Sequence, residues 1–266
     1  MKIEADLHVH TILSSCCSDH QQTVENVVPF LMDRGIRKIA FTDHMWNNPS
    51  VAPSGWYAPQ NGRSILERKT RLKDMLFPIP VLFGAEADMC APDKIGITKD
   101  FREKLDVVLL ATDHFHMRGF MEDLPGPEEI AKIGPYMMKF FRAGLNSGLA
   151  DILVHPLAPC GGWRKNLAQI IESVSDSEMN EALCMAAEKK IGMELNAAVI
   201  TALEKDGGPH YSAYLELMKK AKKAKCLFTI GSDSHSLDDF KTLEAAERFA
   251  DAMELTAADM HPLMHV

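Results

Sequence analysis

Side chains that bind metal ions alternate with apolar ones near the start of the chain, in Asp6-Leu7-His8-Val9-His10. On an extended strand, successive side chains point to opposite faces, so Asp6, His8 and His10 share one face. Two imidazoles in this arrangement can bind one metal ion, and the carboxylate can be a further ligand or can orient a histidine. The alternative is an amphipathic strand with exposed histidines, and this segment alone does not separate the two.

Six more residues of the same types each follow an apolar run further along the chain. They are His44, Glu86, His114, His155, Asp233 and His235. Each of them alone is typical of a solvated strand end. Gathered on one face, however, their carboxylates would repel one another without cations, because an unpaired buried charge is costly. Mixed nitrogen and oxygen ligands favour Zn, Mn or Fe, so we expect two or three divalent ions of these kinds.

Short apolar runs alternate with amphipathic stretches along the chain, which is typical of a parallel α/β sheet. We expect strands at residues 2–9, 37–42, 80–85, 106–111, 151–154, 191–195 and 226–230. We expect helices at residues 24–34, 64–76, 128–146, 166–190, 212–225 and 237–253.

Metal-binding residues follow every one of the expected strands. The C-terminal ends of parallel strands converge on one face of a barrel, and active sites are built there. We therefore expect an α/β fold, a distorted seven-stranded TIM-like (β/α)7 barrel with the metal site at the C-terminal strand ends. The alternative is an open doubly wound sheet, but that fold would gather ligands at a single switch point.

The composition allows one folded domain. Of the 266 residues, 46% are hydrophobic and no linker or repeat is visible, so we expect a single domain over residues 1–266. The net charge of −8 and the lack of a basic stripe argue against binding duplex nucleic acid. No signal peptide or membrane-spanning run is visible, so we expect a cytoplasmic protein without a membrane partner. The six cysteines lack C-x-x-C spacing and are expected to be reduced structural thiols.

In their order and combination, the motifs resemble those of the polymerase and histidinol phosphatase (PHP) superfamily. The matching segments cover nearly the whole chain and are Asp6-x-His8-x-His10, Thr42-Asp43-His44, Glu86, His114, His155-Pro156 and Gly231-Ser232-Asp233-Ser234-His235. The resemblance implies a stand-alone, histidinol-phosphatase-like phosphoesterase with a distorted barrel and a trinuclear metal site. It implies His8, His10, Glu86 and Asp233 as ligands of the first ion, Glu86, His114 and His155 of the second, and His44 and His235 of the third.

The third ion needs one more ligand from the loop after His10. The family often has His or Asp six residues after the second motif histidine, and here that position is Cys16. Counting back from the expected helix start gives Asp19 instead, with His20 beside it. We favour Asp19, because a hard carboxylate suits a phosphatase site.

Hydrolysis of a phosphate ester fits this set of ligands. A water that bridges two metal ions is acidified, and its hydroxide can attack phosphorus while the cations stabilise the developing charge. Glu86 would hold two ions, and Asp233 or His235 would protonate the leaving group. The sequence has neither a G-x-S-x-G motif nor a P-loop, so a serine nucleophile and P-loop chemistry are not expected.

Candidate substrate-binding residues follow two of the expected strands. The spacing favours His114 over His116 as the metal ligand, which leaves His116 near the substrate. Arg118 and Arg164 could each clamp a phosphate with two hydrogen bonds, although ordinary surface arginines are an equally good interpretation. Lys165 is a weaker candidate.

A long loop at residues 45–63 follows the second expected strand and contains Trp46, Trp56 and Tyr57. Loops of this length in barrels usually shape the substrate pocket. The aromatic side chains could stack on a substrate ring or pack the loop down, and we expect packing for at least one of them.

The expected substrate is a small phosphomonoester, such as histidinol phosphate, a nucleotide or a similar metabolite. The alternative is a nuclease, or a polymerase-associated PHP module, that acts on nucleic-acid phosphates. The acidic charge and the absence of polymerase sequence argue against that alternative. A catalytically silent metal-binding module is a third interpretation, and the near-complete set of ligands argues against it.

Overall fold

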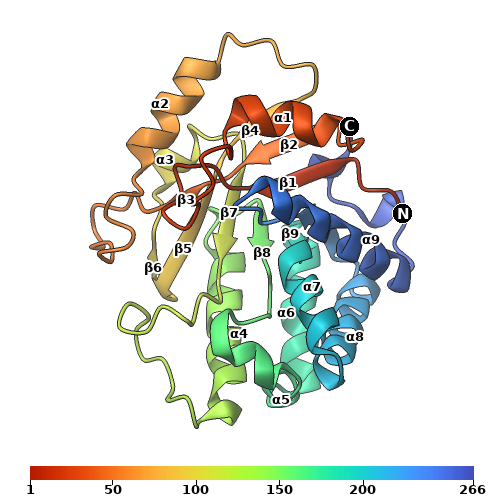
Figure 1. Cartoon of the computed structure of the whole chain (residues 1–266). Coiled ribbons are helices and arrows are strands. Elements are labelled where there is room, and N and C mark those ends of the chain that lie inside the picture. The colour runs from red at the N-terminus through yellow and green to blue at the C-terminus, as the bar shows by residue number, and fades with distance from the viewer.

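The computed structural model describes residues 1–266, and a central set of strands is surrounded by helices (Figure 1). The strands are β1 (Ala5–Val9), β2 (Lys38–Phe41), β3 (His44–Met45), β4 (Val81–Phe83), β5 (Ala85–Ala91), β6 (Lys94–Ile95), β7 (Val108–Ala111), β8 (Ile152–Val154), β9 (Gly192–Asn196) and β10 (Leu227–Gly231). The α-helices are α1 (Val24–Met32), α2 (Gly62–Leu72), α3 (Lys99–Arg102), α4 (Ile130–Asn146), α5 (Leu167–Glu172), α6 (Asp176–Lys189), α7 (Ala197–Asp206), α8 (Pro209–Lys223) and α9 (Leu243–Ala252). Short 3-10 helices are η1 (Gly161–Asn166), η2 (Leu237–Thr242), η3 (Ala257–Asp259) and η4 (Pro262–Met264).

The strands pair into two sheets, in which every pair but one is parallel. One sheet has the order β1–β2–β4, and the other has the order β10–β9–β8–β7–β5–β3. The exception is β6, which pairs antiparallel with β5. All four residues of β7 are buried, as expected for a parallel strand that is covered on both faces. The predicted, mostly parallel α/β architecture is therefore confirmed.

The two sheets approach each other at Gly84, which separates β4 from β5. The Gly84 amide donates to the carbonyl of Phe41 in β2 at 2.9 Å, and the next amide, of Ala85, donates to the carbonyl of Val107 before β7 at 3.3 Å. A Cβ atom on Gly84 would lie 2.2 Å from that Val107 oxygen, so only glycine fits this close approach. The chain therefore passes from one sheet to the other without a loop.

The sheets meet again where β1 lies beside the end of β10. The amide of His10 donates to the carbonyl of Ser234 at 3.1 Å, and the amide of Asp233 donates to the carbonyl of His8 at 2.8 Å. These bonds join the ends of the first and last strands. The strand pairing itself still divides into two sheets, so the closed seven-stranded barrel stays a prediction.

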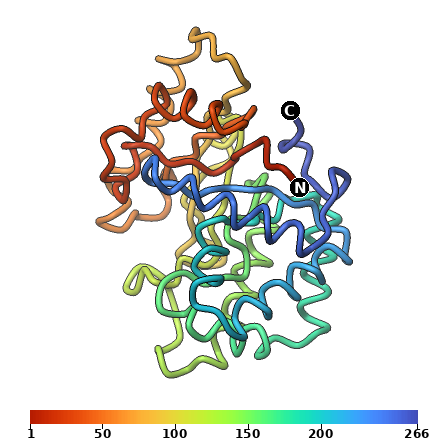
Figure 2. Tube along the Cα trace, turned by 45° about the vertical axis from the view of Figure 1, so that its right-hand side comes forward, coloured from red at the N-terminus to blue at the C-terminus, as the bar shows by residue number.

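Helices cover the outside of both sheets. Figure 1 shows α1 and α2 beside β1, β2 and β4, and the helices from α4 to α9 around the strands from β7 onward. In Figure 2 the two chain termini lie on the same side of the molecule. Seventy-three buried apolar residues form one continuous hydrophobic cluster between helices and strands. None of the helices combines the length and the apolar character needed to span a membrane.

Two parts of the helical prediction were wrong. The single helix expected at residues 166–190 is divided into α5 and α6, because Ser175 caps a new helix by accepting the amide hydrogen of Glu178. The helix α7 was missed because it begins directly after β9, where Asn196 ends the strand and caps the helix through the amide of Val199. No loop composition marks that boundary in the sequence.

Candidate metal centre

The polar residues that follow the strands gather around one pocket of about 630 Å³. Its wall contains five of the residues expected to bind metal, namely His44, Glu86, His114, Asp233 and His235. The other three histidines, His8, His10 and His155, are buried beneath the wall. The strands therefore bring eight of the nine expected side chains to one place, and the ninth, Asp19, is not part of the wall.

Four donor atoms form the first group, and they come from β1, β5 and the end of β10. The Nε2 atoms of His8 and His10 are 3.0 Å apart. Oε2 of Glu86 lies 3.4 and 3.3 Å from these two nitrogens, and Oδ1 of Asp233 lies 3.5 and 3.1 Å from them. Donors at about 2.1 Å from a tetrahedral ion are about 3.4 Å apart, so the spacing of this group matches the size of a metal ion.

The other carboxylate oxygen of Glu86 faces a second pair of histidines. Its Oε1 atom lies 3.3 Å from Nε2 of His155 and 3.7 Å from Nε2 of His114. One carboxylate thus presents one oxygen to each of two histidine pairs. This is the geometry of a ligand that bridges two ions.

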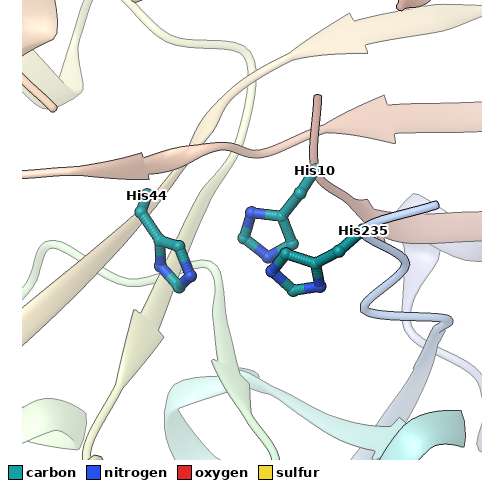
Figure 3. A group of neighbouring side chains, drawn as sticks. All are labelled: His10, His44 and His235. Atoms are coloured by element: carbon teal, nitrogen blue, oxygen red, sulfur yellow. The ribbon is translucent and has the colours of Figure 1, made fainter. Parts of the chain in front are cut away.

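A third group of histidines lies on the other side of the first (Figure 3). The rings of His10 and His235 are stacked with centroids 4.2 Å apart, and the ring of His44 lies 4.4 Å from that of His10. Their ligand atoms lie within 4.8 Å of one another. Nδ1 of His44 is buried and lies 2.8 Å from Oε2 of Glu86, so the same carboxylate oxygen also faces this third group.

Carboxylates from other strands or strand ends fix the orientation of three of these rings. Each ring shares a hydrogen bond through Nδ1 with one carboxylate, His8 with Glu194 at 2.7 Å, His114 with Asp88 at 2.6 Å and His155 with Asp113 at 2.7 Å. A carboxylate accepts this proton and leaves the Nε2 lone pair directed at the centre of the cluster. Such carboxylate–histidine pairs are common behind metal ligands.

Two further rings are oriented by other acceptors. The hydroxyl of Ser14 donates to Asp43 at 2.7 Å, so it accepts from Nδ1 of His10 at 2.9 Å. Nδ1 of His235 donates to the carbonyl of Asp233 at 2.9 Å. Nε2 is again the free nitrogen in both rings, which agrees with a role as metal ligands.

The electrostatics of the metal-free cluster also fit cations. Burial alone would lower the pKa of His8, but Glu194, Asp233 and Glu86 raise it well above its usual value. The facing histidines hold the pKa of Glu86 and of Asp233 well below the usual range, although burial opposes this shift. Without metal, these carboxylates are therefore ionised and are balanced by imidazolium. This set of nitrogen and oxygen donors suits binding of divalent metal ions.

In the metal-free cluster, the pKa values favour neither of the two predicted proton donors. Asp233 is ionised, as its lowered pKa requires, and therefore has no proton to give. Burial and the neighbouring His10 lower the pKa of His235 to about 4, so its ring is neutral at pH 7. The one ring proton of His235 is held by the Asp233 carbonyl.

The structure places Asp19 away from the pocket wall, contrary to our expectation for the third ion. Its carboxylate accepts the amide hydrogens of Gln21 at 2.9 Å and of Leu237 at 3.2 Å. It therefore ties the loop after β1 to the start of η2. Cys16 lies in the wall instead, whereas His20 is exposed and is not part of it. The Asp19 carboxylate binds backbone amides, and this explains why it does not line the pocket.

The candidate substrate-binding residues separate into two sets. His116 and Arg118 lie in the wall, and the guanidinium of Arg118 is 5.0 Å from the ring of Trp163. Arg164 and Lys165 belong to η1 and are not part of the wall. His114 is buried beside Asp88 whereas His116 is exposed, which agrees with the expected division between ligand and substrate residue.

The long loop after β3 shapes the pocket as expected. Trp56 lies in the wall, whereas Trp46 and Tyr57 are buried and pack against each other with ring centroids 5.5 Å apart. The hydroxyl of Tyr57 donates to Asp88 at 2.8 Å. The loop therefore reaches the carboxylate that orients His114.

Sequence reasoning missed the residues that orient the ligands. Glu194, Asp113 and Asp88 follow or lie within buried strands, so their position was visible, but their partners depend on which strands are neighbours. The buried ion pair between Arg68 of α2 and Asp43 was also missed. Arg68 looks like an ordinary residue of an amphipathic helix, and no signal in the sequence marks it.

Comparison with known proteins was made at the level of family, sequence and structure. No family model matches the chain. A protein named probable phosphatase from Aliivibrio fischeri is 24% identical over 257 residues, which cover 96% of this chain and 88% of that protein. A second protein of that name, from Syntrophotalea carbinolica, is 29% identical over 109 residues, and this match covers only 40% of its length.

Solved structures extend the likeness to the fold. Histidinol phosphate phosphatase from Lactococcus lactis, solved in complex with zinc, L-histidinol and phosphate, superposes with a TM-score of 0.57 at 16% identity, over 95% of this chain and 94% of that one. The chain has the fold of a histidinol phosphate phosphatase. A Listeria monocytogenes protein provisionally assigned as the same enzyme gives a TM-score of 0.60 at 11% identity, over 88% and 96% of the two chains. The resemblance to the PHP superfamily that the motifs predicted is therefore borne out by fold and by relatives.

Proposed function

We propose that this chain is a metal-dependent phosphoesterase that hydrolyses a small phosphomonoester. The observation that carries the proposal is the position of Glu86, whose two oxygens face two different pairs of histidines. A carboxylate in that position suits a site with two ions, and His44 and His235 would hold a third. The phosphatase names of the relatives and the zinc and phosphate in the related structure support the same activity.

The residues of this chain have distinct tasks in such a reaction. Divalent ions held there supply an acidified water and neutralise charge on the phosphate. Glu194, Asp88 and Asp113 keep the imidazoles fixed, so that the site needs little rearrangement when substrate binds. Arg118, Trp56 and His116 line the pocket, so in this proposal Arg118 would pair with phosphate oxygens and the two rings would border the rest of the substrate.

A small substrate suits the dimensions and charge of the molecule better than a nucleic acid. A pocket of about 630 Å³ is within the range of small-molecule sites, roughly 300–1,000 Å³. The net charge of −8 disfavours a polyanion, which supports a metabolite over the nuclease alternative. Histidinol phosphate and nucleotides are the first candidates.

We also propose that residues 1–266 form one domain built on a single distorted seven-stranded barrel. In this interpretation β4 and β5 count as one strand that is bent at Gly84, and the hydrogen bonds between the ends of β1 and β10 close the ring. The continuous hydrophobic cluster supports a single domain. Ligands from strands of both sheets then surround one axis, as they do in barrel enzymes.

The test compares the purified protein with the Glu86→Gln variant. We expect bound Zn, Mn or Fe in the wild type, and activity toward sugar, amino-alcohol or nucleotide monophosphates. The variant keeps the fold, because the amide has the same shape, but it loses most of this activity because a neutral amide stabilises two cations poorly. Metal content by mass spectrometry and phosphate release measure both effects.

Two results would reject the proposal. One is a wild type that binds metal but hydrolyses no monoester while it degrades single-stranded DNA, which would favour the nuclease alternative. The other is wild-type turnover with full metal content in the Glu86→Gln variant, which would remove the bridging role.

A further inference from the structure

One thiol belongs to the polar cluster. Sγ of Cys160 and the ligand nitrogens of His114 and His155 all lie within 4.8 Å of one another. Donors around a tetrahedral ion with bonds of about 2.0–2.3 Å are about 3.3–3.8 Å apart, so a group within the 4.8 Å limit reaches this spacing by small side-chain shifts at most. Both histidines are more than nine-tenths buried, and Cys160 is half-buried.

The loop after β8 is folded so that Cys160 returns to His155. The Asp113 carboxylate accepts hydrogen bonds from Nδ1 of His155 at 2.7 Å and from the amide of Ala158 at 3.2 Å, and the Asp113 carbonyl accepts one from the amide of Cys160 at 3.1 Å. The same residue therefore orients the imidazole and positions the thiol. Gly161 then leaves the loop at φ +80°, where a side chain would strain the backbone and contact His116.

The two histidines near the thiol each have one nitrogen available for a metal ion. Nδ1 of His114 is held by Asp88 and Nδ1 of His155 by Asp113, so Nε2 is the available donor in each ring. Oε1 of Glu86 lies 3.7 and 3.3 Å from these two Nε2 atoms. Two nitrogens and one oxygen thus surround a position to which the sulfur of Cys160 would add a fourth donor.

We propose that the Cys160 thiolate is a ligand of the second metal ion, together with His114, His155 and Glu86. This proposal deepens the proposed function and rests on it, since it specifies the donors of one of its ions. The S–H bond breaks on metal binding, the proton goes to solvent, and the sulfur electron pair forms the bond to the metal. No oxidation or reduction takes part.

The sulfur changes which ion this position prefers. Thiolate is a soft ligand that selects Zn, whereas carboxylate and water suit Mn or Mg. We therefore expect this ion to be Zn, and to be held more tightly than an N2O set of donors would allow. The other two groups of ligands contain only nitrogen and oxygen and discriminate less among metals.

The test uses cobalt as a spectroscopic probe of the full chain. Metal-free protein is reconstituted with Co²⁺, and thiolate ligation gives an intense ligand-to-metal charge-transfer band in the near ultraviolet. We expect this band in the wild type and in Cys184→Ser, the matched control for an exposed cysteine on α6, and expect it to be absent in Cys160→Ser. A band that persists in Cys160→Ser and disappears in Cys16→Ser would assign the sulfur to Cys16 and overturn the proposal.

A second measurement needs no variant. Alkylation by iodoacetamide followed by peptide mapping is compared between the metal-free and the Zn-loaded wild type. We expect Zn to slow modification of Cys160 at least about 10-fold and to leave Cys184 unchanged, because a bound thiolate is a poor nucleophile. Equal rates at Cys160 in the two states would overturn the proposal whether or not Cys160→Ser folds.

These outcomes separate this proposal from the proposed function. A wild type that binds Zn and hydrolyses phosphomonoesters, but shows no cobalt–thiolate band and no protection of Cys160, refutes only the thiolate ligand. A wild type that binds no divalent metal refutes both. Competition of Zn with Mn adds a graded readout, in which Cys160→Ser loses at least about 10-fold of the preference for Zn.

Discussion

The histidines of the cluster carry protons where metal ions would bind. Burial opposes the charge on His8, His114 and His155, yet the carboxylates that face them raise each pKa well above its usual value. At pH 7 without metal these rings are therefore charged, and an incoming cation must displace their protons. Protons compete more strongly with metal ions because Glu194, Asp88 and Asp113 raise these pKa values.

From this competition we expect metal affinity to increase as the pH rises from about 6 to 8 and to fall on acidification. The sign follows from the raised pKa values, because the protonated form competes with the metal below them. Calorimetry in two buffers of different ionisation enthalpy measures the number of protons released. Zn binding without proton release, or an affinity that does not change with pH, would contradict the expected protonation state.

The two candidate arginines form a natural pair for a kinetic test. Arg118 lies in the pocket wall, whereas Arg164 lies outside it in η1. We expect Arg118→Met to raise KM for a phosphomonoester about 10-fold or more, since a charge-assisted pair contributes roughly 1.5–3 kcal/mol. Arg164→Met should change KM less than about two-fold, and neither variant should lose metal. Equal KM values for wild type and Arg118→Met would mean that the phosphate is held without this guanidinium.

A buried ion pair joins α2 to Asp43, which lies just after β2. Arg68 of α2 is bonded to the Asp43 carboxylate, and both side chains are almost fully buried. Burial raises the pKa of Asp43, but Arg68, His10 and several hydrogen bonds outweigh it and lower the pKa to about 2. The hydrogen bonds include that of Ser14, which also orients His10. The pair therefore supports the metal cluster from outside it.

Removing Arg68 should leave the Asp43 charge buried and unpaired. We expect Arg68→Met to lower the free energy of unfolding at pH 7 by about 3–5 kcal/mol. The matched control is Arg63→Met in the same helix, whose exposed i,i+4 pair with Glu67 contributes at most about 0.5 kcal/mol. Urea unfolding of both metal-free variants measures the difference. A loss for Arg68→Met no larger than that of the control would refute a structural role for the pair.

The pH dependence of this loss has a defined sign. In the wild type the pKa of Asp43 is about 2, below its unfolded value, so its contribution is complete above about pH 4 and is lost as the pH falls toward 2. In Arg68→Met the carboxyl lacks its cation and is protonated more readily. The two proteins should therefore approach each other in stability as the pH decreases from about 4, in the same urea experiment.

A structural element can be predicted from the sequence when the interactions that form it involve residues close together in the chain. The strands after which ligands appear were predicted because buried parallel strands are short apolar runs, as in β7 and β9. The division between α5 and α6 was not, because both segments are amphipathic and the capping by Ser175 occupies a single turn. The carboxylates that orient the histidines could not be predicted either, since they act between different strands, such as Glu194 of β9 on His8 of β1. Their pairing depends on the tertiary fold.

The position of the ligands in the two sheets has a consequence for the whole molecule. His8 belongs to β1 of the smaller sheet and His10 directly follows that strand, whereas Glu86 belongs to β5 of the larger sheet. An ion bound between them therefore joins the sheets where strand pairing is interrupted. Such an ion binds the folded chain and not the unfolded one, so it stabilises the fold by mass action.

We expect removal of metal by a chelator to lower the free energy of unfolding by about 4 kcal/mol, the value for a free metal concentration about 1,000 times the dissociation constant. For a chain of this size that corresponds to a decrease in Tm of about 10 °C. Thermal unfolding with and without chelator measures the shift. In the Glu86→Gln variant the same treatment should change Tm by only a few degrees, because the carboxylate from the larger sheet is lost. A chelator effect of equal size in wild type and variant would show that the ions stabilise one sheet alone, and an absent effect in the wild type would show that the sheets hold together without them.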